Sequence, residues 1–209
     1  MDQAFYIHAI NPVAFQIGPL GVKWYSLAYF FGVIIGWQYC KVLLRKYSPL
    51  NPRKSTASTE IDNIFDNFII WIILGIILGG RIGYILFYNL HFYLSNPFEI
   101  FAIWHGGMSF HGGLIGVLAA TAIYSSKNKI QFFPLADLIA CVSPIGLFLG
   151  RVANFINGEL VGKITDTPWA VIFPKYDYNP RHPSQLYEAM LEGVVLFLHI
   201  TALNVKCKI

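Results

Sequence analysis

The sequence predicts an all-α polytopic membrane protein with about five transmembrane helices. Hydrophobic residues make up 56% of the 209-residue chain, charged residues only 12%, and the mean hydropathy is +0.53, all far from the values of soluble domains. Several apolar runs are about 20 residues long, which is the length that a helix needs to cross a hydrocarbon core roughly 30 Å thick. Such spans must be helical, because backbone groups in lipid have to pair within their own segment.

Five apolar stretches account for most of the chain, which we expect to form a single transmembrane domain over residues 1–209. The stretches are 22–44, 65–90, 98–124, 133–158 and 185–205. No basic segment precedes an apolar one at the N-terminus, so we expect no cleaved signal peptide. The three cysteines are scattered without metal-ligand spacing, and we expect neither a metal nor a cofactor. The net charge of +4 is too diffuse to indicate binding of nucleic acid.

Lysine and arginine residues set the expected orientation of these spans. Basic residues gather after the first and third spans, at Lys41, Arg45, Lys46, Arg53, Lys54, Lys127 and Lys129. By the positive-inside rule, both of these loops are cytoplasmic. Residues 1–21 and 91–97 contain no lysine or arginine and are expected outside, which gives an N-out, C-in topology. The stretch 159–184, rich in Pro, Trp and Tyr, then forms a small extracytoplasmic cap between the last two spans.

Polar residues from all five spans fall at similar expected depths. With a rise of about 1.5 Å per residue, the following residues lie roughly 21–28 Å from the cytoplasmic ends of their spans: Tyr25, Arg81, His111 and Arg151. Further polar residues at the outer ends of the last two spans are Asn154, Glu159, His182, Gln185 and Glu188. Each such group costs free energy in lipid unless it faces protein or a wet cavity. The sequence therefore predicts a polar chamber in the outer half of the bilayer, open outward.

The stretch HGGMSFHGG places two histidines and two glycine pairs in the outer part of the third span. Residues six apart lie about 240° apart around a helix, so His105 and His111 cannot share one site on an unbroken helix. The deeper His111 is the candidate for function, or alternatively a hydrogen-bonded core histidine, whereas His105 is expected at the interface. The glycines either allow close helix packing or form irregular backbone that lines a cavity.

The densest polar cluster is LGRVANFINGELVG, residues 149–162. Arg151 and Asn154 share a helix face at i, i+3, and Glu159 stands just beyond them. An arginine with amide and carboxylate neighbours suits a phosphate ester, which it can bind through two donors. The alternative is that Arg151 snorkels to the interface with Glu159 as its counter-ion. A similar motif, GGRIGYILFYN, places Arg81 either in the same chamber or in a structural ion pair.

Two further polar segments open the last and first spans. In PRHPSQLYEAMLEG, the residues Gln185, Glu188 and Glu192 include i, i+3 and i, i+4 neighbours on one side of the helix. Because Glu192 is the deepest of them, it must be paired or protonated. In WYSLAYFFG, composition alone assigns Tyr25 to an interfacial aromatic belt.

Together these motifs resemble those of the prolipoprotein diacylglyceryl transferases of bacteria. GGMSFHGGLIG, GRVANFINGELVG and RHPSQLYEAMLEGVVLF occur in the family's order and spacing, with GGRIGYILFYN and WYSLAY, from about residue 5 to about residue 198. The resemblance implies an enzyme of the bacterial inner membrane whose active site lies toward the outer leaflet. Such an enzyme moves the diacylglyceryl group of phosphatidylglycerol onto the lipobox cysteine of a prolipoprotein signal peptide. A thioether forms and glycerol phosphate leaves.

The resemblance also implies roles for individual residues. His111 would be the base or proton relay for the thiol, Tyr25 its companion, and Arg151 the clamp on the departing phosphate. The glycines beside His111 would make room for the lipid head group. The other substrate-binding residues expected are Asn154, Glu159, Gly162, Arg81, Gln185 and Glu188. The expected partners are phosphatidylglycerol, the prolipoprotein signal peptide and the bilayer, without nucleic acid.

The chain departs from the family's pattern at two places. Ala153 stands where the family usually has glycine, a change of one methyl group that we expect to tighten helix packing. Family members continue into a further helix whose arginine and glutamate face the cavity, whereas this chain stops at LNVKCKI. We therefore expect lower stability than in a longer relative and weak or absent activity. The alternatives to an active transferase are a catalytically impaired truncated remnant and a small outward-facing anion transporter.

Overall fold

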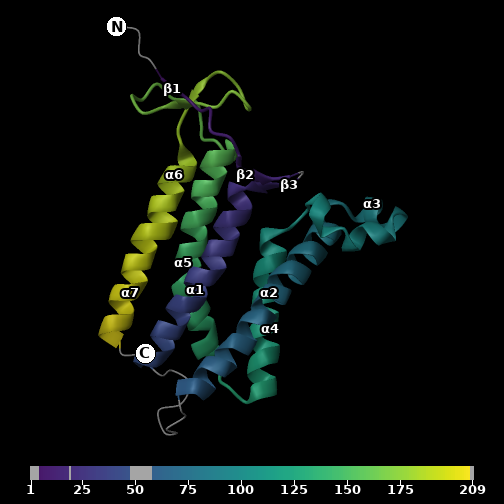
Figure 1. Cartoon of the computed structure of the whole chain (residues 1–209), viewed down its shortest axis with the longest axis vertical. Helices are drawn as coiled ribbons and strands as arrows, with labels where there is room; N and C mark the ends of the chain where they lie inside the picture. The colour runs from purple at the N-terminus through teal and green to yellow at the C-terminus, as the bar shows by residue number, and fades with distance from the viewer. Residues whose placement is uncertain (1–4, 19, 48–57, 208–209) are drawn as a thin grey trace. The chain divides into compact units, whose positions relative to one another are not determined.

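The structure, a computed structural model, describes residues 5–18, 20–47 and 58–207 (Figure 1). It confirms an all-α polytopic membrane architecture. Among the described residues, the helical segments long and apolar enough to cross a bilayer are Trp24–Leu44, Phe65–Tyr88, Phe132–Asn157 and Ser184–Leu203. These segments coincide closely with four of the five predicted spans. Arg53 and Lys54, two of the basic residues behind the predicted orientation, lie outside the described residues.

The chain forms two compact units, residues 1–40 with 140–209 and residues 41–139. Its helices are α1 (Trp24–Tyr47), α2 (Ser58–Tyr88), α3 (Leu90–Ser95), α4 (Phe110–Asn128), α5 (Phe132–Asn157), α6 (Ser184–Glu188) and α7 (Leu196–Cys207). A π-helical segment, η3 (Ala189–Val195), joins α6 to α7 into one continuous helix. Two 3-10 turns, η1 (Pro97–Phe101) and η2 (Ile103–His105), precede α4. Helices α1 and α5 each run through the boundary between the units.

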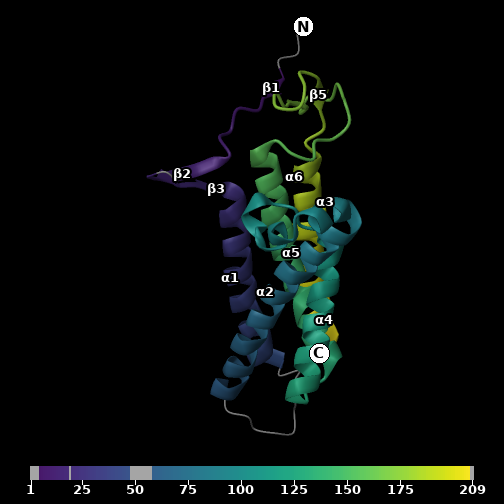
Figure 2. The ribbon, with the colours of Figure 1, turned by 90° about the vertical axis from the view of Figure 1, so that its right-hand side faces the viewer.

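In the first unit, α1, α5 and the helix built from α6, η3 and α7 pack side by side (Figure 1 and Figure 2). Small residues allow these helices to approach each other closely. A Cβ atom placed on Gly32 of α1 would lie 3.7 Å from the Cα of Gly146 on α5. A Cβ on Gly193 would lie only 2.7 Å from the Cβ of Phe148. Glycine at 193 therefore holds the last helix directly against α5.

A small cap lies above these helices and includes the predicted segment 159–184 (Figure 1). Its three-stranded sheet pairs β4 (Val171–Ile172) with β1 (Tyr6–Ile7) in parallel and with β5 (Pro180–Arg181) in antiparallel. Directly after β4 and β1 lie Phe173, which is fully buried, and His8, whose pKa is lowered by burial. Strand β1 comes from the N-terminal segment, for which the sequence predicted no strand. A hairpin of β2 (Val13–Ile17) and β3 (Leu20–Lys23) leads from β1 into α1.

Asp177 and Arg181 form an ion pair within the cap. The Asp177 carboxylate accepts hydrogen bonds from Nε of Arg181 at 3.0 Å and from its Nη2. These bonds lower the pKa of Asp177 from 3.8 to about 2. Because this carboxyl has a lower pKa in the folded state, the pair stabilises the cap above about pH 4, and that stabilisation is lost as the pH falls toward 2.

We expect a carbon-detected NMR titration of the Asp177 carboxyl to give a midpoint near 2 in the wild-type protein. In Arg181→Gln, which removes the charged donors, the midpoint should move up toward the ordinary value of about 3.9 for aspartate. A wild-type midpoint close to the ordinary aspartate value would contradict the ion pair.

In the second unit, α2 and α4 pack through facing glycines. Gly75, Gly79 and Gly83 recur every four residues along one face of α2 and lie against Gly112 and Gly116 of α4. A Cβ on Gly79 would lie 2.3 Å from the carbonyl oxygen of Gly112, a distance that forbids any side chain. This is the close backbone approach that small residues at four-residue spacing provide between membrane helices. It supports the packing alternative for Gly112.

We expect Gly112→Ala to separate α2 from α4. The new Cβ would lie 2.3 Å from the carbonyl oxygen of Gly79 and 2.9 Å from the Cα of Gly83. Overpacking of this kind costs about 1–3 kcal/mol of folding free energy. The matched control is Gly113→Ala, whose Cβ would meet only the carbonyl of Ile76, at 3.8 Å. Thermal unfolding in detergent should show a lower midpoint for the first variant alone, and equal midpoints would contradict the glycine packing.

The third predicted span, 98–124, is wrong at its start, because the helix begins only at Phe110. Gly106 and Gly107 have φ values of +83° and +82°, which lie in the left-handed region and cannot continue a right-handed helix. Ser109 then caps α4, its Oγ accepting a hydrogen bond from the amide of Gly112 at 3.2 Å. Helix α4 is not among the four apolar segments, so its crossing of the bilayer stays a prediction.

Candidate functional site

Arg151 is held between two carboxylates of the last helix. Its Nη1 lies 2.8 Å from Oε2 of Glu188, while Nε and Nη2 donate to Oε2 of Glu192 at 3.3 and 3.2 Å. All three side chains are partly buried. The prediction that Glu192 must be paired is confirmed. The counter-ions of Arg151 are thus Glu188 and Glu192, not Glu159 as the snorkelling alternative assumed.

The backbone of the last helix explains why both glutamates reach the same guanidinium. Glu188 ends α6 and Glu192 lies within η3, where the helix widens to i→i+5 hydrogen bonding. Residues four apart stay on one face in either kind of helix. Single turns of π-helix are often found at functional sites. The direct packing of Gly193 on Phe148 brings this face to within contact of α5, which carries Arg151.

Asn154 and Glu159 form a second set of contacts at the end of α5. The Glu159 carboxylate accepts hydrogen bonds from the amides of Asn154 at 3.5 Å and Asn157 at 3.3 Å. Gln185, which is fully buried, donates from its Nε2 to the main-chain carbonyl of Glu159. This bond ties the start of the last helix to the segment that follows α5. Asn154 lies one turn beyond Arg151, so both sets of contacts occupy the same end of the unit.

Tyr25 and Gly162 complete the predicted residues of the first unit. The Tyr25 hydroxyl lies 3.0 Å from that of Tyr29, one helical turn along α1, and the two rings meet edge to face. Tyr25 is partly buried, whereas Tyr29 is exposed. Gly162 belongs to the backbone of the cap, because its amide donates to the carbonyl of His182 at 3.1 Å. A Cβ there would lie 2.6 Å from that oxygen, so the position requires glycine.

His111 lies in the first turn of α4, on its exposed side. Its ring packs edge to face on that of Phe110, with centroids 5.7 Å apart. Within the described part of the chain, the imidazole makes no hydrogen bond or ion pair. The alternative of a hydrogen-bonded core histidine therefore does not fit this geometry. An exposed imidazole without a polar partner among the described residues is available to a substrate.

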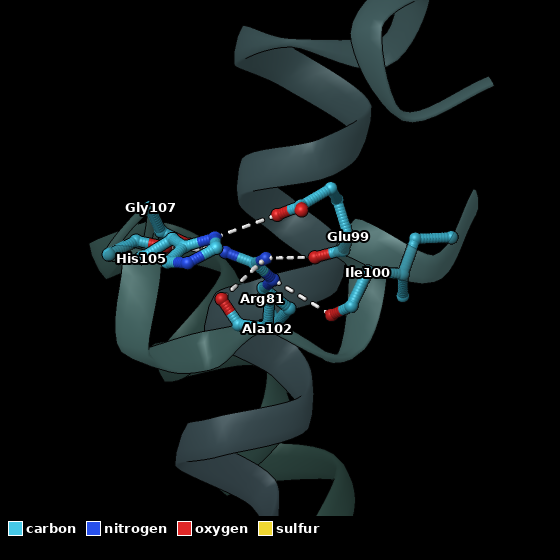
Figure 3. Close-up of polar contacts among 7 residues, drawn as sticks. Arg81, Glu99, Ile100, Ala102, His105 and Gly107 are labelled. Atoms are coloured by element: carbon cyan, nitrogen blue, oxygen red, sulfur yellow. Dashed lines mark hydrogen bonds and ion pairs between the residues drawn. The ribbon is translucent and has the colours of Figure 1, made fainter. Parts of the chain in front are cut away.

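Arg81 is buried and donates all its hydrogen bonds to main-chain carbonyls (Figure 3). The acceptors are Glu99, Ile100, Ala102, Gly106 and Gly107. The guanidinium also lies 5.0 Å from the ring centroid of Tyr93. Arg81 thus holds in place the non-helical segment that leads to α4. Neither of the two alternatives for Arg81, a place in the chamber or an ion pair, describes this arrangement, because its donors are taken up by the main chain.

The neighbouring His105 also has a structural partner. Its Nδ1 lies 2.8 Å from Oε2 of Glu99, and both side chains are exposed (Figure 3). His105 ends the 3-10 turn η2 and does not belong to α4. The two histidines of HGGMSFHGG therefore have different surroundings, and only His111 is left without a polar partner among the described residues.

The predicted site residues divide between the two units. The first unit brings together Arg151, Asn154, Glu159, Gln185 and Glu188, with Tyr25 on α1. The second unit holds His111 and Arg81. A single chamber shared by His111 and Arg151 thus stays a prediction.

Sequence analysis missed three residues at this end of the first unit. Glu192 was expected to need a partner but was not assigned to the site. Lys23 and Lys175 line a cavity beside Glu159, although one precedes α1 and the other lies in the cap. For Glu192, its i, i+4 spacing from Glu188 was a signal in the sequence that could have assigned it to the site. No local pattern connects two lysines that stand so far apart in the sequence.

Comparison with known proteins gives consistent matches along nearly the whole chain. The model of the family described as prolipoprotein diacylglyceryl transferase matches residues 12–208. A phosphatidylglycerol–prolipoprotein diacylglyceryl transferase of Azospirillum brasilense is 52% identical over 196 residues, which cover 93% of this chain and 70% of that protein. The enzyme of the same name from Rhodopseudomonas palustris is 52% identical, covering 94% and 68%. The one from Rickettsia canadensis is 48% identical, covering 95% and 73%.

Proposed function

The chain belongs to the prolipoprotein diacylglyceryl transferase family, and we propose that it moves the diacylglyceryl group of phosphatidylglycerol onto the lipobox cysteine of prolipoproteins. The observation that carries this proposal is the family match over residues 12–208. The arrangement around Arg151 supports it, because a guanidinium held on a polar helix face suits a phosphate ester.

The transfer replaces one bond to carbon by another. The cysteine sulfur attacks the glycerol carbon that bears the phosphate, a C–S bond forms, and the C–O bond breaks. Glycerol phosphate leaves with the electron pair of that bond, and the thiol proton passes to a base. The site therefore needs a base for the thiol and a cation for the departing phosphate. We assign these roles to His111 and Arg151.

Phosphate binding requires Arg151 to exchange a counter-ion. Two carboxylates already surround one guanidinium, so an added phosphate would leave an uncompensated negative charge. Glu188 contacts only Nη1, whereas Glu192 accepts from both Nε and Nη2. In our proposal the phosphate takes the place of Glu188 at Nη1, and Glu192 keeps the plane of the guanidinium fixed. Tyr25, Asn154 and Glu159 then border the bound head group.

The membrane setting follows from the same proposal. We place the protein in the bacterial inner membrane as one transmembrane domain with N-out, C-in topology. The end of the first unit that carries Arg151 and the cap then faces the outer leaflet. This orientation brings the site to the leaflet where a translocated signal peptide presents its cysteine, and basic residues such as Lys127 and Lys129 stay inside.

The proposal is tested with the purified chain in vesicles that contain phosphatidylglycerol and a fluorescent lipobox peptide. We expect the peptide to gain one diacylglyceryl group and one equivalent of glycerol phosphate to be released. A peptide with serine in place of the cysteine should remain unmodified, as should the cysteine peptide in vesicles of phosphatidylethanolamine alone. Release of glycerol phosphate without modification of the peptide, or no reaction at all, would contradict the proposed transfer.

A further inference from the structure

A cavity of about 360 Å³ opens in the first unit where α1 begins and α5 ends. Its lining residues are Pro12, Lys23, Asn157, Gly158, Glu159 and Lys175. Its volume falls within the range of about 300–1,000 Å³ that is usual for small-molecule sites. Four of the six lining residues, Lys23, Asn157, Glu159 and Lys175, have charged or amide side chains, so the cavity suits a polar ligand.

Two lysines give this cavity an excess of positive charge. Lys23 and Lys175 line it together with a single carboxylate, that of Glu159. The Lys175 ammonium donates to the main-chain carbonyl of Asn157 at 3.4 Å, which occupies one of its three donors. Within the described ranges, neither ammonium is in an ion pair with a carboxylate. The donors left over suit an anion.

The neighbouring charges show why an anionic substrate needs these lysines. Arg151 carries one positive charge against the two carboxylates that it contacts, and Glu159 adds a third negative charge at the same end of α5. A phosphate approaching this cluster would be repelled unless other cations lay close. Glu159 connects the two regions, because it lines the cavity and accepts a hydrogen bond from Asn154.

We propose that this cavity binds the glycerol phosphate group beside Arg151, with the phosphate oxygens that Arg151 does not contact on Lys23 and Lys175 and the glycerol hydroxyls on Glu159 and Asn157. The inference rests on the proposed function, which makes this group both the head group of the donor lipid and the leaving group. Amide and carboxylate oxygens accept hydrogen bonds from hydroxyls, and ammonium groups bind phosphate as point charges. The cavity thus provides a second cationic site beside Arg151.

Titration of the purified chain in detergent with glycerol phosphate, followed by calorimetry, tests the site directly. We expect Lys23→Gln combined with Lys175→Gln to weaken binding by about tenfold, a change of about 1.4 kcal/mol. The double variant with arginine at both positions keeps the charges and should stay within about threefold of wild type. Lys163→Gln, which removes a cap lysine outside the cavity, should bind as wild type does. Equal affinity in the double glutamine variant and wild type would overturn the proposal, as would equal binding of uncharged glycerol.

Enzyme kinetics distinguish the free leaving group from the lipid head group. If the cavity receives the leaving group, the double glutamine variant should show weaker inhibition by glycerol phosphate and an unchanged KM for phosphatidylglycerol. If it receives the head group, the KM should rise together with the inhibition constant. Either result supports the site and identifies its ligand. No change in either constant would overturn it.

Experiment can contradict the transferase function and the glycerol phosphate cavity independently of each other. A wild-type chain that binds glycerol phosphate but never modifies a lipobox peptide would contradict the transferase function and leave the cavity as a glycerol phosphate site. A chain that modifies the peptide but binds no glycerol phosphate would contradict the cavity and leave the function intact.

Discussion

Replacing His111 by alanine is expected to lower the rate of diacylglyceryl transfer by about 10²–10⁴-fold, which is the usual contribution of a general base. The imidazole is exposed at the start of α4 and makes no hydrogen bond or ion pair among the described residues. It is therefore available to take a proton from an incoming thiol. The rate is measured with the fluorescent lipobox peptide in vesicles of phosphatidylglycerol, at equal amounts of inserted protein.

The matched control for this variant is His105→Ala. His105 lies six residues earlier in the same motif, but it pairs with Glu99 and ends the 3-10 turn η2. We expect this variant to keep most of the wild-type rate. Retention of more than about a tenth of the rate in His111→Ala would contradict its role as base. Equal losses in both variants would indicate a structural effect on the whole segment.

Arg151→Lys is expected to lower kcat/KM by about 10²-fold, comparable to the loss of one donor that stabilises charge in a transition state. The guanidinium contacts Glu192 through two nitrogens and Glu188 through a third. A lysine ammonium is a single point charge and cannot keep this fork geometry while it also binds a phosphate. Affinity for phosphatidylglycerol in detergent should fall along with the rate.

The two glutamates provide the comparison that separates binding from positioning. Glu188→Gln removes the carboxylate that the phosphate is proposed to replace, so we expect the KM for phosphatidylglycerol to fall or stay unchanged. Glu192→Gln removes the carboxylate that fixes the guanidinium, and we expect kcat to fall. Equal affinity of Arg151→Lys and wild type would favour a purely structural arginine. A higher KM for phosphatidylglycerol in Glu188→Gln than in wild type would contradict the counter-ion exchange.

Hydropathy and length predicted four membrane-spanning segments closely, because the number of consecutive apolar residues can be read directly from the sequence. The third span failed at its start for a different reason. Gly106 and Gly107 are compatible with a helix in composition, and only their positive φ values show that the chain turns there. A sequence does not reveal which backbone conformation a glycine adopts.

The candidate site could likewise be predicted only in part. The spacing of Arg151 and Asn154 predicted their common face, and the depth of Glu192 predicted its need for a partner. The partners of Arg81 could not be predicted, since they are main-chain carbonyls that any residue could supply. The cavity lysines could not be predicted either, because Lys23 and Lys175 are brought together only by the folding of the cap over the ends of α1 and α5.

Because the last helix contains the π-helical segment Ala189–Val195, the direction in which its side chains point depends on the number of residues in that segment. A π-helical turn is wider than an α-helical turn and contains about one additional residue. Deleting one residue between Glu188 and Glu192 would change their relative direction by about 100°, the angle that one residue occupies in an α-helix. Glu192 would then turn away from Arg151, although the hydrophobicity of the span would hardly change. Among related sequences, a single-residue gap at this point would mark chains that still enter the membrane but no longer hold their arginine in place.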